Sequence, residues 1–160
     1  MLNISVICVG KLKEKFYLDA SAEYLKRLSK YCKLQITELP EAKRPADPTE
    51  GDIKAALEKE AAAIREKIPK GAAVIPMCIE GKQVDSPQLA AMLGNYASSG
   101  VSKLCFLIGG SDGLHESVKA LGDTKLSMSK MTFPHHLARV MLLEQIYRGF
   151  KILEGSRYHK

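Results

Sequence analysis

The sequence predicts an α/β fold: a mostly parallel sheet with helices on both faces, formed by residues 1–160 as one domain. Short apolar runs rich in β-branched residues alternate five times with segments of helical periodicity, which is typical of parallel strands joined by crossover helices. These runs are continuously apolar, as strands buried on both faces are. A length of 160 residues suits one domain, and no repeat, low-complexity segment or linker divides the chain.

The N-terminal part predicts two strands and two helices. Residues 3–9, NISVICV, form an apolar β-branched run and predict the first strand. A helix over 16–31 and a second strand that ends at Pro40 follow. Three prolines within 40–52 indicate a surface loop, after which a helix covers 53–68. The apolar stripes of the two helices are Phe16, Ala20, Tyr24, Leu28 and Tyr31 in the first, and Ile53, Leu57, Ala61, Ile64 and Ile68 in the second.

A third strand is predicted over 72–79, with Pro76 inside it. Because proline cannot donate a hydrogen bond to a neighbouring strand, we expect an edge position or a bulge there. Glu80-Gly81 predicts a turn. Asp85-Ser86-Pro87 is typical of a helix start, with a capping residue and then proline in the first turn. The buried side of that helix consists of Leu89, Met92, Leu93 and Tyr96.

The C-terminal part begins with a strand over 103–108 that leads directly into two glycines and a short helix. The apolar residues of that helix segment are Leu114, Val118 and Leu121. A brief strand around Leu126 and Met128 and the polar loop SKMTFP follow. The last helix, about 135–153, is apolar on nearly every side, as a helix is in a core or at a subunit interface. We therefore expect a homodimer.

Composition and spacing narrow the function classes. The formal net charge of +6 fits a polyanionic partner without requiring one. No segment could span a bilayer, and the N-terminus lacks a basic region and a cleavage site, so we expect a cytoplasmic protein without membrane contact. His135 and His136 have no third ligand at metal spacing, so no metal is expected. The cysteines, which show no C-x-x-C and favour buried reduced thiols, are Cys8, Cys32, Cys78 and Cys105.

Gly109 and Gly110 stand at the carboxyl end of a predicted parallel strand, where ligands bind in open α/β sheets. Glycine there allows a ligand to approach the backbone, although a tight turn without a ligand explains the same pair. No Lys-Ser/Thr follows them, and the first strand ends at a lone Gly10, so neither a P-loop nor a dinucleotide fingerprint is present. The residues favour a smaller ligand held by backbone groups.

Three blocks, IGGSDGL, LSMSKMTFPHHLARVMLLEQIYR and the terminal RYHK, closely resemble the RlmH family of SPOUT, or α/β-knot, methyltransferases. The resemblance covers the whole chain, including CVGKLKEKF near the start and IEGK at 79–82. It implies a C-terminal deep trefoil knot and S-adenosylmethionine as the methyl donor. It also implies methylation of N3 of a pseudouridine, position 1915 in helix 69 of 23S ribosomal RNA, on assembled ribosomes by a homodimer.

The resemblance also implies which residues act. The donor would lie in three loops that contain Met77, Gly109 with Gly110, and Met128, Ser129, Lys130, Met131, Thr132 and Phe133. The family favours leucine or isoleucine at the first position, so Met77 is a departure, although a shape-tolerant one. On the substrate side the motifs point to Arg148, Tyr158 and His159, with His135 shaping the pocket. Among the tail groups, the imidazole is the one suited to proton transfer near neutrality.

The residues alone leave alternatives open. Arg148 lies one turn after Glu144, so a salt bridge within the helix explains it, as does contact with an RNA phosphate or the target base. The chain as a whole is also compatible with a flavodoxin-like binder of another small ligand, or with a ribosome- or RNA-binding factor without turnover. Binding of S-adenosylmethionine distinguishes the first alternative, and turnover on ribosomes distinguishes the second.

Overall fold

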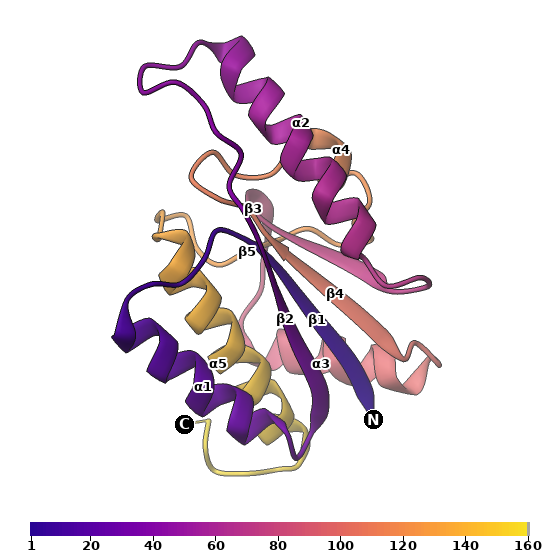
Figure 1. Cartoon of the computed structure of the whole chain (residues 1–160). Helices are drawn as coiled ribbons and strands as arrows, with labels where there is room; N and C mark the ends of the chain where they lie inside the picture. Colours follow the sequence, from indigo (N-terminus) through magenta and orange to yellow (C-terminus); the bar gives the residue numbers. More distant parts are fainter. Residues whose placement is uncertain (160) are drawn as a thin grey trace.

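The computed structural model describes residues 1–159 and shows a five-stranded sheet with helices on both faces (Figure 1). The strands, in the spatial order β2-β1-β4-β3-β5, are β1 Leu2–Val9, β2 Cys32–Leu39, β3 Ala73–Gln83, β4 Lys103–Ile108 and β5 Leu126–Ser127. Every neighbouring pair is parallel, which confirms the predicted α/β class. The helices are α1 Lys15–Leu28, α2 Glu50–Lys67, α3 Ser86–Ser98, α4 Glu116–Lys119 and α5 His135–Leu153. The trefoil knot stays a prediction.

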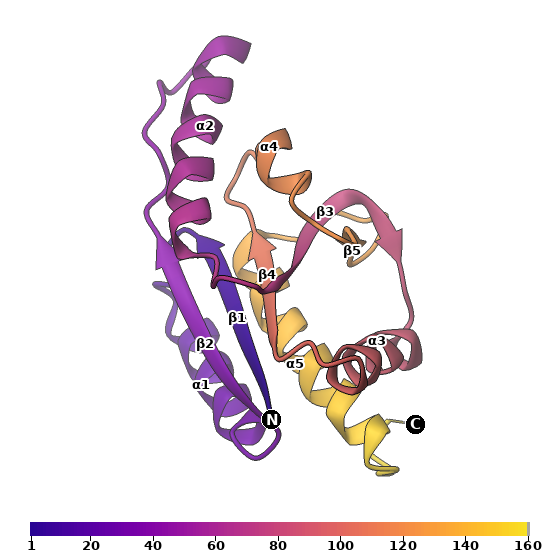
Figure 2. The same cartoon turned by 90° about the vertical axis from the view of Figure 1, so that its right-hand side faces the viewer.

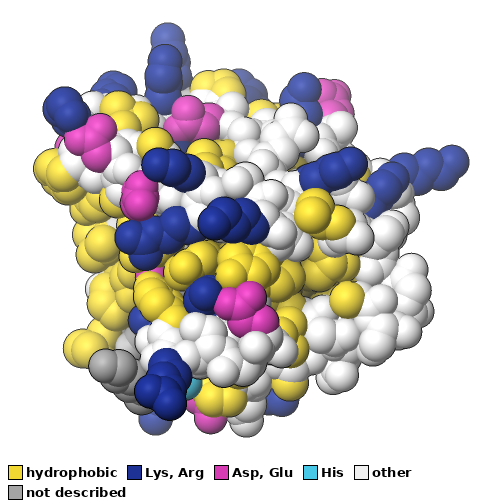
Figure 3. Space-filling view, turned by 90° about the horizontal axis from the view of Figure 1, so that it is seen from below, with side chains coloured by type: hydrophobic (Ala, Val, Ile, Leu, Met, Phe, Trp, Pro, Cys, Tyr) yellow, Lys and Arg dark blue, Asp and Glu magenta, His cyan; other side chains and the backbone are white. Residues whose placement is uncertain are grey.

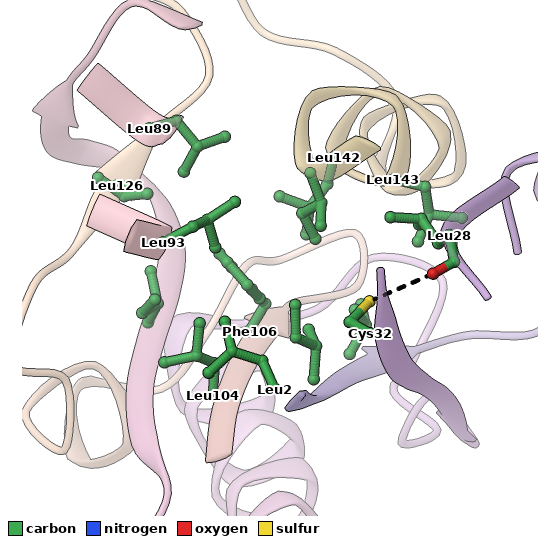
Figure 4. Packing of buried hydrophobic residues seen from close by; sticks show 14 of the residues in the cluster. Leu2, Leu28, Cys32, Leu89, Leu93, Leu104, Phe106, Leu126, Leu142 and Leu143 are labelled. Atoms are coloured by element: carbon green, nitrogen blue, oxygen red, sulfur yellow. Dashed lines mark hydrogen bonds between the residues drawn. The ribbon is translucent and has the colours of Figure 1, made fainter. Parts of the chain in front are cut away.

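The two faces of the sheet are covered by different helices, because successive strand residues point to opposite sides. Figures 1 and 2 show α1, α3 and α5 on one side and α2 with α4 on the other. On the first face, Phe106 of β4 packs in one cluster with Leu28 of α1, Leu93 of α3 and Leu142 of α5 (Figure 4). The other cluster contains Ile7 and Leu107 from strands, Ile64 of α2 and Val118 of α4.

The predicted start of the third helix is confirmed in atomic detail. Asp85 precedes α3, and its carboxylate accepts a hydrogen bond from the backbone N–H of Gln88 at 2.8 Å. The Gln88 side chain in turn accepts from the backbone N–H of Asp85, also at 2.8 Å. Proline follows in the first turn, where its missing N–H costs nothing. This reciprocal capping fixes the point at which the chain leaves β3 and enters α3.

The structure tests two predictions about β3. Of the edge position or bulge expected at Pro76, the edge is wrong, because β5 lies outside β3, whereas an irregularity is present directly after it, where the β3–β5 register shifts between Met77 and Lys82. The turn predicted at Glu80-Gly81 is wrong, since β3 continues through both residues. Glycine is required there for close approach: a Cβ on Gly81 would lie 2.5 Å from a backbone carbon of β5.

The predicted apolar stripe of the first helix is wrong at its beginning. α1 starts at Lys15, and the Phe16 side chain is 66% exposed instead of buried. The first turn of α1 lies outside the apolar cluster that Leu28 and Tyr24 join, and Phe16 contacts Tyr17 with ring centroids 4.4 Å apart. The predicted stripe therefore holds only for the C-terminal half of α1, which packs on the sheet.

All four cysteines are free and lie in strands, and Cys8, Cys32 and Cys105 are buried as expected. Burial raises the pKa of the Cys8 and Cys105 thiols to about 12, so both stay protonated. Cys78 is only partly buried, because it lies where β3 passes the cavity described below. Among residues 1–159, no helix is long and apolar enough to cross a membrane.

Candidate functional site

A cavity of about 780 Å³ lies at the carboxyl ends of β3, β4 and β5, the edge of a parallel sheet where ligands bind. Its wall comes from three segments, 77–80, 108–114 and 127–135, together with side chains of α4 and α5. The volume falls in the range of small-molecule sites, and the lining is mainly apolar with a few polar groups. The large apolar side chains of the wall are Met77, Ile79, Ile108, Leu114, Met128, Met131, Phe133 and Leu142.

The residues predicted for the donor converge on this cavity from three separate loops. Lys130 is the exception: it is exposed, and the structure does not place it in the wall. His135, predicted to shape the pocket, also lines it. The predicted residues that line the cavity are Met77, Gly109, Gly110, Met128, Ser129, Met131, Thr132 and Phe133.

The paired glycines allow the loop after β4 to fold back on itself. A Cβ on Gly109 would lie 2.3 Å from the carbonyl oxygen of Gly113, a distance no atom pair tolerates. Gly113 has φ +81 and donates its N–H to the Gly110 carbonyl at 3.1 Å, which closes a tight turn. The expectation that Gly109 directly clears room for a ligand is therefore wrong: it clears room for backbone, and the resulting turn forms the cavity wall.

The same turn is held from the side by the loop that follows β2. The Glu41 carboxylate accepts a hydrogen bond from the Ser111 backbone N–H at 3.0 Å, and Arg44 pairs with Asp112 at 2.6 Å. Burial opposes the charged form of Glu41, but the hydrogen bonds from Ser111 outweigh it and lower the pKa of this carboxyl group. The turn is thus fixed by two ionised side chains that sequence reasoning did not single out.

A buried arginine connects the start of α5 with the ends of β1 and β2. The Arg139 side chain is 2% exposed; its Nη1 pairs with Glu38 at 2.5 Å, and its Nη2 donates to the Gly10 carbonyl at 2.9 Å. Gly10 has φ +103, and a Cβ there would lie 3.3 Å from Nε2 of His135. Burial, followed by the neighbouring His136, lowers the pKa of His135, so the imidazole that faces the cavity is neutral.

Removing the partner of Arg139 is expected to destabilise the fold. Glu38→Ala leaves a buried guanidinium without its carboxylate and should lower the free energy of unfolding by about 3 kcal/mol. Urea unfolding measures this, with Glu23→Ala as the control, because the Glu23–Arg27 pair is exposed and its loss should cost much less stability. Equal losses in the two variants would contradict the prediction.

The pH dependence of the same pair has a definite sign. Burial opposes ionisation of Glu38, but the hydrogen bonds from Arg139 and from the Leu12 backbone N–H outweigh it and lower its pKa. A lowered folded-state pKa stabilises the fold above the ordinary pKa of a glutamate, and this contribution is lost as pH falls through the lowered value. Glu38→Ala should therefore lose less stability than the parent chain on acidification.

The three substrate-side residues predicted from the motifs lie together, but away from the cavity. α5 ends in a reversal at Gly155, which has φ +74; the Ser156 N–H donates to the Lys151 carbonyl at 3.0 Å. The tail then returns along α5, and Tyr158 packs edge-on against Tyr147 with ring centroids 5.1 Å apart. Lys160, the last residue of the motif, lies outside the described residues.

Arg148 is the centre of this tail cluster, which we define as Glu144, Arg148, Tyr158 and His159. Nε and Nη2 of Arg148 donate to Glu144 at 2.9 and 2.5 Å, so the salt bridge weighed above is present. The guanidinium also lies 4.8 Å from the centroid of the Tyr158 ring, and its Nη1 is 3.2 Å from Nδ1 of His159. The salt bridge and the tail contacts therefore exist together.

One chain cannot bring the tail cluster to its own cavity. His135 lies at the cavity and Arg148 lies near the other end of α5, about 20 Å away at the rise of an α-helix. None of Arg148, Tyr158 and His159 lines the cavity. If the two groups act on one substrate, the tail cluster of a second copy must reach the cavity.

The residues that sequence reasoning missed are charged side chains that hold the site in place: Glu38, Glu41, Arg44 and Arg139. Glu41 and Arg44 follow β2, whose carboxyl end lies at the same edge as that of β4, and this topological argument could have paired them with the glycine turn. The loops that line the cavity were predicted from motif alone. Within residues 1–159, no three His, Cys, Asp or Glu side chains are arranged to hold a metal ion.

The chain is similar to known methyltransferases over nearly its whole length. Residues 2–159 match a family described as predicted SPOUT methyltransferase. The chain is 48% identical to the putative ribosomal RNA large subunit methyltransferase H of Methanococcus maripaludis and 49% identical to ribosomal RNA large subunit methyltransferase H of Clostridium beijerinckii. Both alignments cover 99% of this chain and 100% of the relative.

The likeness extends to a solved structure at much lower identity. A probable methylase family protein from Haemophilus influenzae superimposes with a TM-score of 0.56 at 13% identity, over 98% of this chain and 70% of that one. At this identity the likeness concerns the fold alone. It agrees with the parallel sheet and helices described above.

Proposed function

The chain belongs to the RlmH family of SPOUT methyltransferases, and from that premise we propose that it methylates 23S ribosomal RNA. The methyl donor is S-adenosylmethionine, and the acceptor is N3 of a pseudouridine in helix 69 of the assembled ribosome. Methylation of large-subunit ribosomal RNA is supported by the names of relatives that align with this chain over their whole length. The base, the atom and the ribosomal substrate rest on the family resemblance.

The observation that supports the methyl donor best is the cavity at the ends of β3, β4 and β5. Its apolar walls suit an adenine ring, and its glycine turn presents backbone to the ligand. The two acidic side chains of its wall are each paired with a cation, Glu80 with Lys119 at 2.6 Å and Asp112 with Arg44. The residues present therefore fit a folded ligand that places a flat ring against apolar side chains and its polar groups against backbone and the polar residues of the wall.

The donor supplies an activated methyl group on a sulfonium, so no metal is needed to activate it. What the chain must do is hold the pocket rigid, exclude water and align the acceptor nitrogen in line with the methyl group. The apolar residues around Met77 and Phe133 exclude water, and the turn held by Glu41 and Arg44 fixes the backbone. The tail cluster supplies a ring for stacking and a cation for the RNA.

The working unit is a homodimer, because each chain carries the cavity and the tail cluster at opposite ends of α5. Leu137, Val140 and Met141 of α5 remain partly exposed, as a helix at a subunit interface would be. Figure 3, which views the end where β1 begins and α5 ends, shows apolar side chains gathered between basic ones. Light scattering at micromolar concentration should give twice the 17.6 kDa mass of the chain; the mass of one chain would contradict this proposal.

Transfer of a tritiated methyl group from S-adenosylmethionine to purified 70S ribosomes tests the proposal directly. We expect incorporation into 23S RNA of ribosomes and little into naked ribosomal RNA, with the label in N3-methylpseudouridine after nuclease digestion. Binding of the donor without incorporation would favour an RNA-binding factor without turnover. Absence of donor binding by calorimetry would favour a binder of another small ligand.

A further inference from the structure

We propose that His159 acts as a hydrogen-bond donor to the target base and not as the acceptor of its proton, with Glu144 as the positioning residue that fixes this arrangement. The proposal deepens the function proposed above and rests on it. It follows from the tail cluster, where the contacts determine which groups donate a hydrogen bond and which accept one.

The contact between Arg148 and His159 determines which ring nitrogen carries hydrogen. A guanidinium has only donors, so the 3.2 Å approach of Nη1 to Nδ1 is a hydrogen bond only if Nδ1 is the acceptor. The neutral ring must then carry its hydrogen on Nε2. The hydrogen bond found for the His159 ring among residues 1–159 is the one at Nδ1, and the residue is partly exposed, so the Nε2–H can be donated to a group from outside the chain.

Arg148 and Tyr158 of the tail cluster are also donors. The Tyr158 hydroxyl donates to Glu144 at 3.2 Å, and burial together with that carboxylate raises the pKa of Tyr158, so the phenol keeps its proton. The hydrogen bond to Glu144 raises the pKa of Arg148, which stays charged. Neither residue can accept a proton from the base. Because Arg148 and Tyr158 already donate to Glu144, the Nε2–H of His159 is the donor we assign to an oxygen of the base.

Glu144 fixes the set through both of its carboxylate oxygens. Oε1 accepts from Arg148 and Tyr158, and Oε2 accepts from the Gln145 side chain at 2.7 Å. Gln145 in turn accepts a hydrogen bond from Ser86 in the first turn of α3 at 2.6 Å. The carboxylate, 17% exposed, therefore aligns Arg148 on His159 and ties the tail to the body of the protein.

The chemistry this arrangement serves is transfer to the anion of an imide. The N3–H proton of the base passes to water, and the negative charge spreads onto a neighbouring carbonyl oxygen, which accepts the Nε2–H of His159. The N3 lone pair then forms the bond to the methyl carbon, and the C–S bond breaks with its electron pair on sulfur. A donor placed at the developing charge acts as in an oxyanion hole, where loss of one donor costs about 10²–10³ in kcat.

Two substitutions at the same position separate a donor from a base. His159→Gln offers an amide N–H at a similar reach but no basic nitrogen, whereas His159→Ala offers neither. We expect kcat for ribosome methylation to stay within about tenfold of the parent for Gln and to fall about 10²–10³-fold for Ala. Equal losses for Gln and Ala in an active parent would overturn the donor role, and full activity of both would overturn any role of His159 in the reaction.

The positioning role of Glu144 can be tested by the tautomer of His159, which a purely structural role of Glu144 would leave unchanged. ¹⁵N NMR of histidine-labelled protein should show the Nε2–H tautomer of His159 in the parent and a mixture of tautomers in Glu144→Ala, with kcat lowered and donor affinity unchanged. Glu154→Ala is the matched control, because Glu154 lies at the same end of α5 and pairs with Lys151 instead. An Nδ1–H tautomer in the parent, or an unchanged tautomer in Glu144→Ala, would overturn the proposal.

Failure of this inference and failure of the proposed function look different. If the parent transfers no methyl group to ribosomes, the proposed function fails and the role of His159 fails with it. If the parent is active and binds donor normally while Gln and Ala at position 159 are equally inactive, only the donor role fails.

Discussion

Gly109→Val is expected to abolish binding of S-adenosylmethionine while leaving the chain folded. A Cβ at this position would lie 2.3 Å from the carbonyl oxygen of Gly113, so the turn over 110–113 must open. The turn forms one wall of the cavity, and its displacement also breaks the hydrogen bond from Ser111 to Glu41. The sheet does not depend on the turn, since β4 ends before it.

Thermal unfolding with and without saturating donor measures the effect. The parent should gain stability by mass action, about 2.7 kcal/mol at a hundredfold excess over Kd, and Gly109→Val should show no shift. Gly109→Ala should fail nearly as badly, because the first added carbon already collides with backbone. Gly100→Ala is the control: Gly100 is distant from the cavity wall and has nothing within 4 Å of its Cβ position, so any loss from its φ of +83 concerns stability alone. Normal calorimetric binding by Gly109→Val would show that the pocket is placed wrongly.

The sheet was predictable because its signals are local. Continuous apolar runs such as 3–9 and 103–108 are stable only when both faces of the strand are buried. Strands of this kind occur mainly in parallel sheets covered by helices on both sides. The errors occur where the reason for a residue is a distant neighbour. Gly81 suggests a turn in sequence, but the reason for glycine there is that β5 passes 2.5 Å from its Cβ position. Phe16 fits the apolar stripe of α1, but the packed cluster does not extend to the first turn of that helix.

The motifs predicted the loops that line the candidate site, but they did not predict the charged residues that hold these loops in place. The glycines and the methionine-rich loop are visible as unusual residues in sequence, but Arg139 looks like any helical arginine. Its burial depends on Glu38 and the Gly10 carbonyl, which are more than a hundred residues away in the chain. Likewise, Glu144 forms a salt bridge within α5 that sequence suggests, whereas its bond to Tyr158 depends on the reversal at Gly155.

Deletion of residues 158–160 is expected to eliminate methylation while leaving most of the dimer intact. The deletion removes the Tyr158 ring and the His159 imidazole, both in contact with Arg148, which we propose stack on an unstacked base and donate a hydrogen bond to it. It leaves α5 complete, and three residues are too few to supply much of an interface. Methyl transfer to ribosomes should fall below detection, whereas light scattering should still report the mass of two chains.

A mixed dimer tests the proposal that the tail of one chain serves the cavity of the other, which is based on their separation of about 20 Å along α5. One chain carries Gly109→Val and the other lacks residues 158–160, each with its own affinity tag, so that tandem purification isolates the mixture. If each site combines the cavity of one chain with the tail of its partner, one intact cavity meets one intact tail and about half of the parent activity returns. If each chain must supply both parts, the mixed dimer is as inactive as either homodimer, because every chain then carries a defect. Full activity in the tail-deleted homodimer would remove Tyr158 and His159 from the site and leave Arg148 as the only residue on the substrate side.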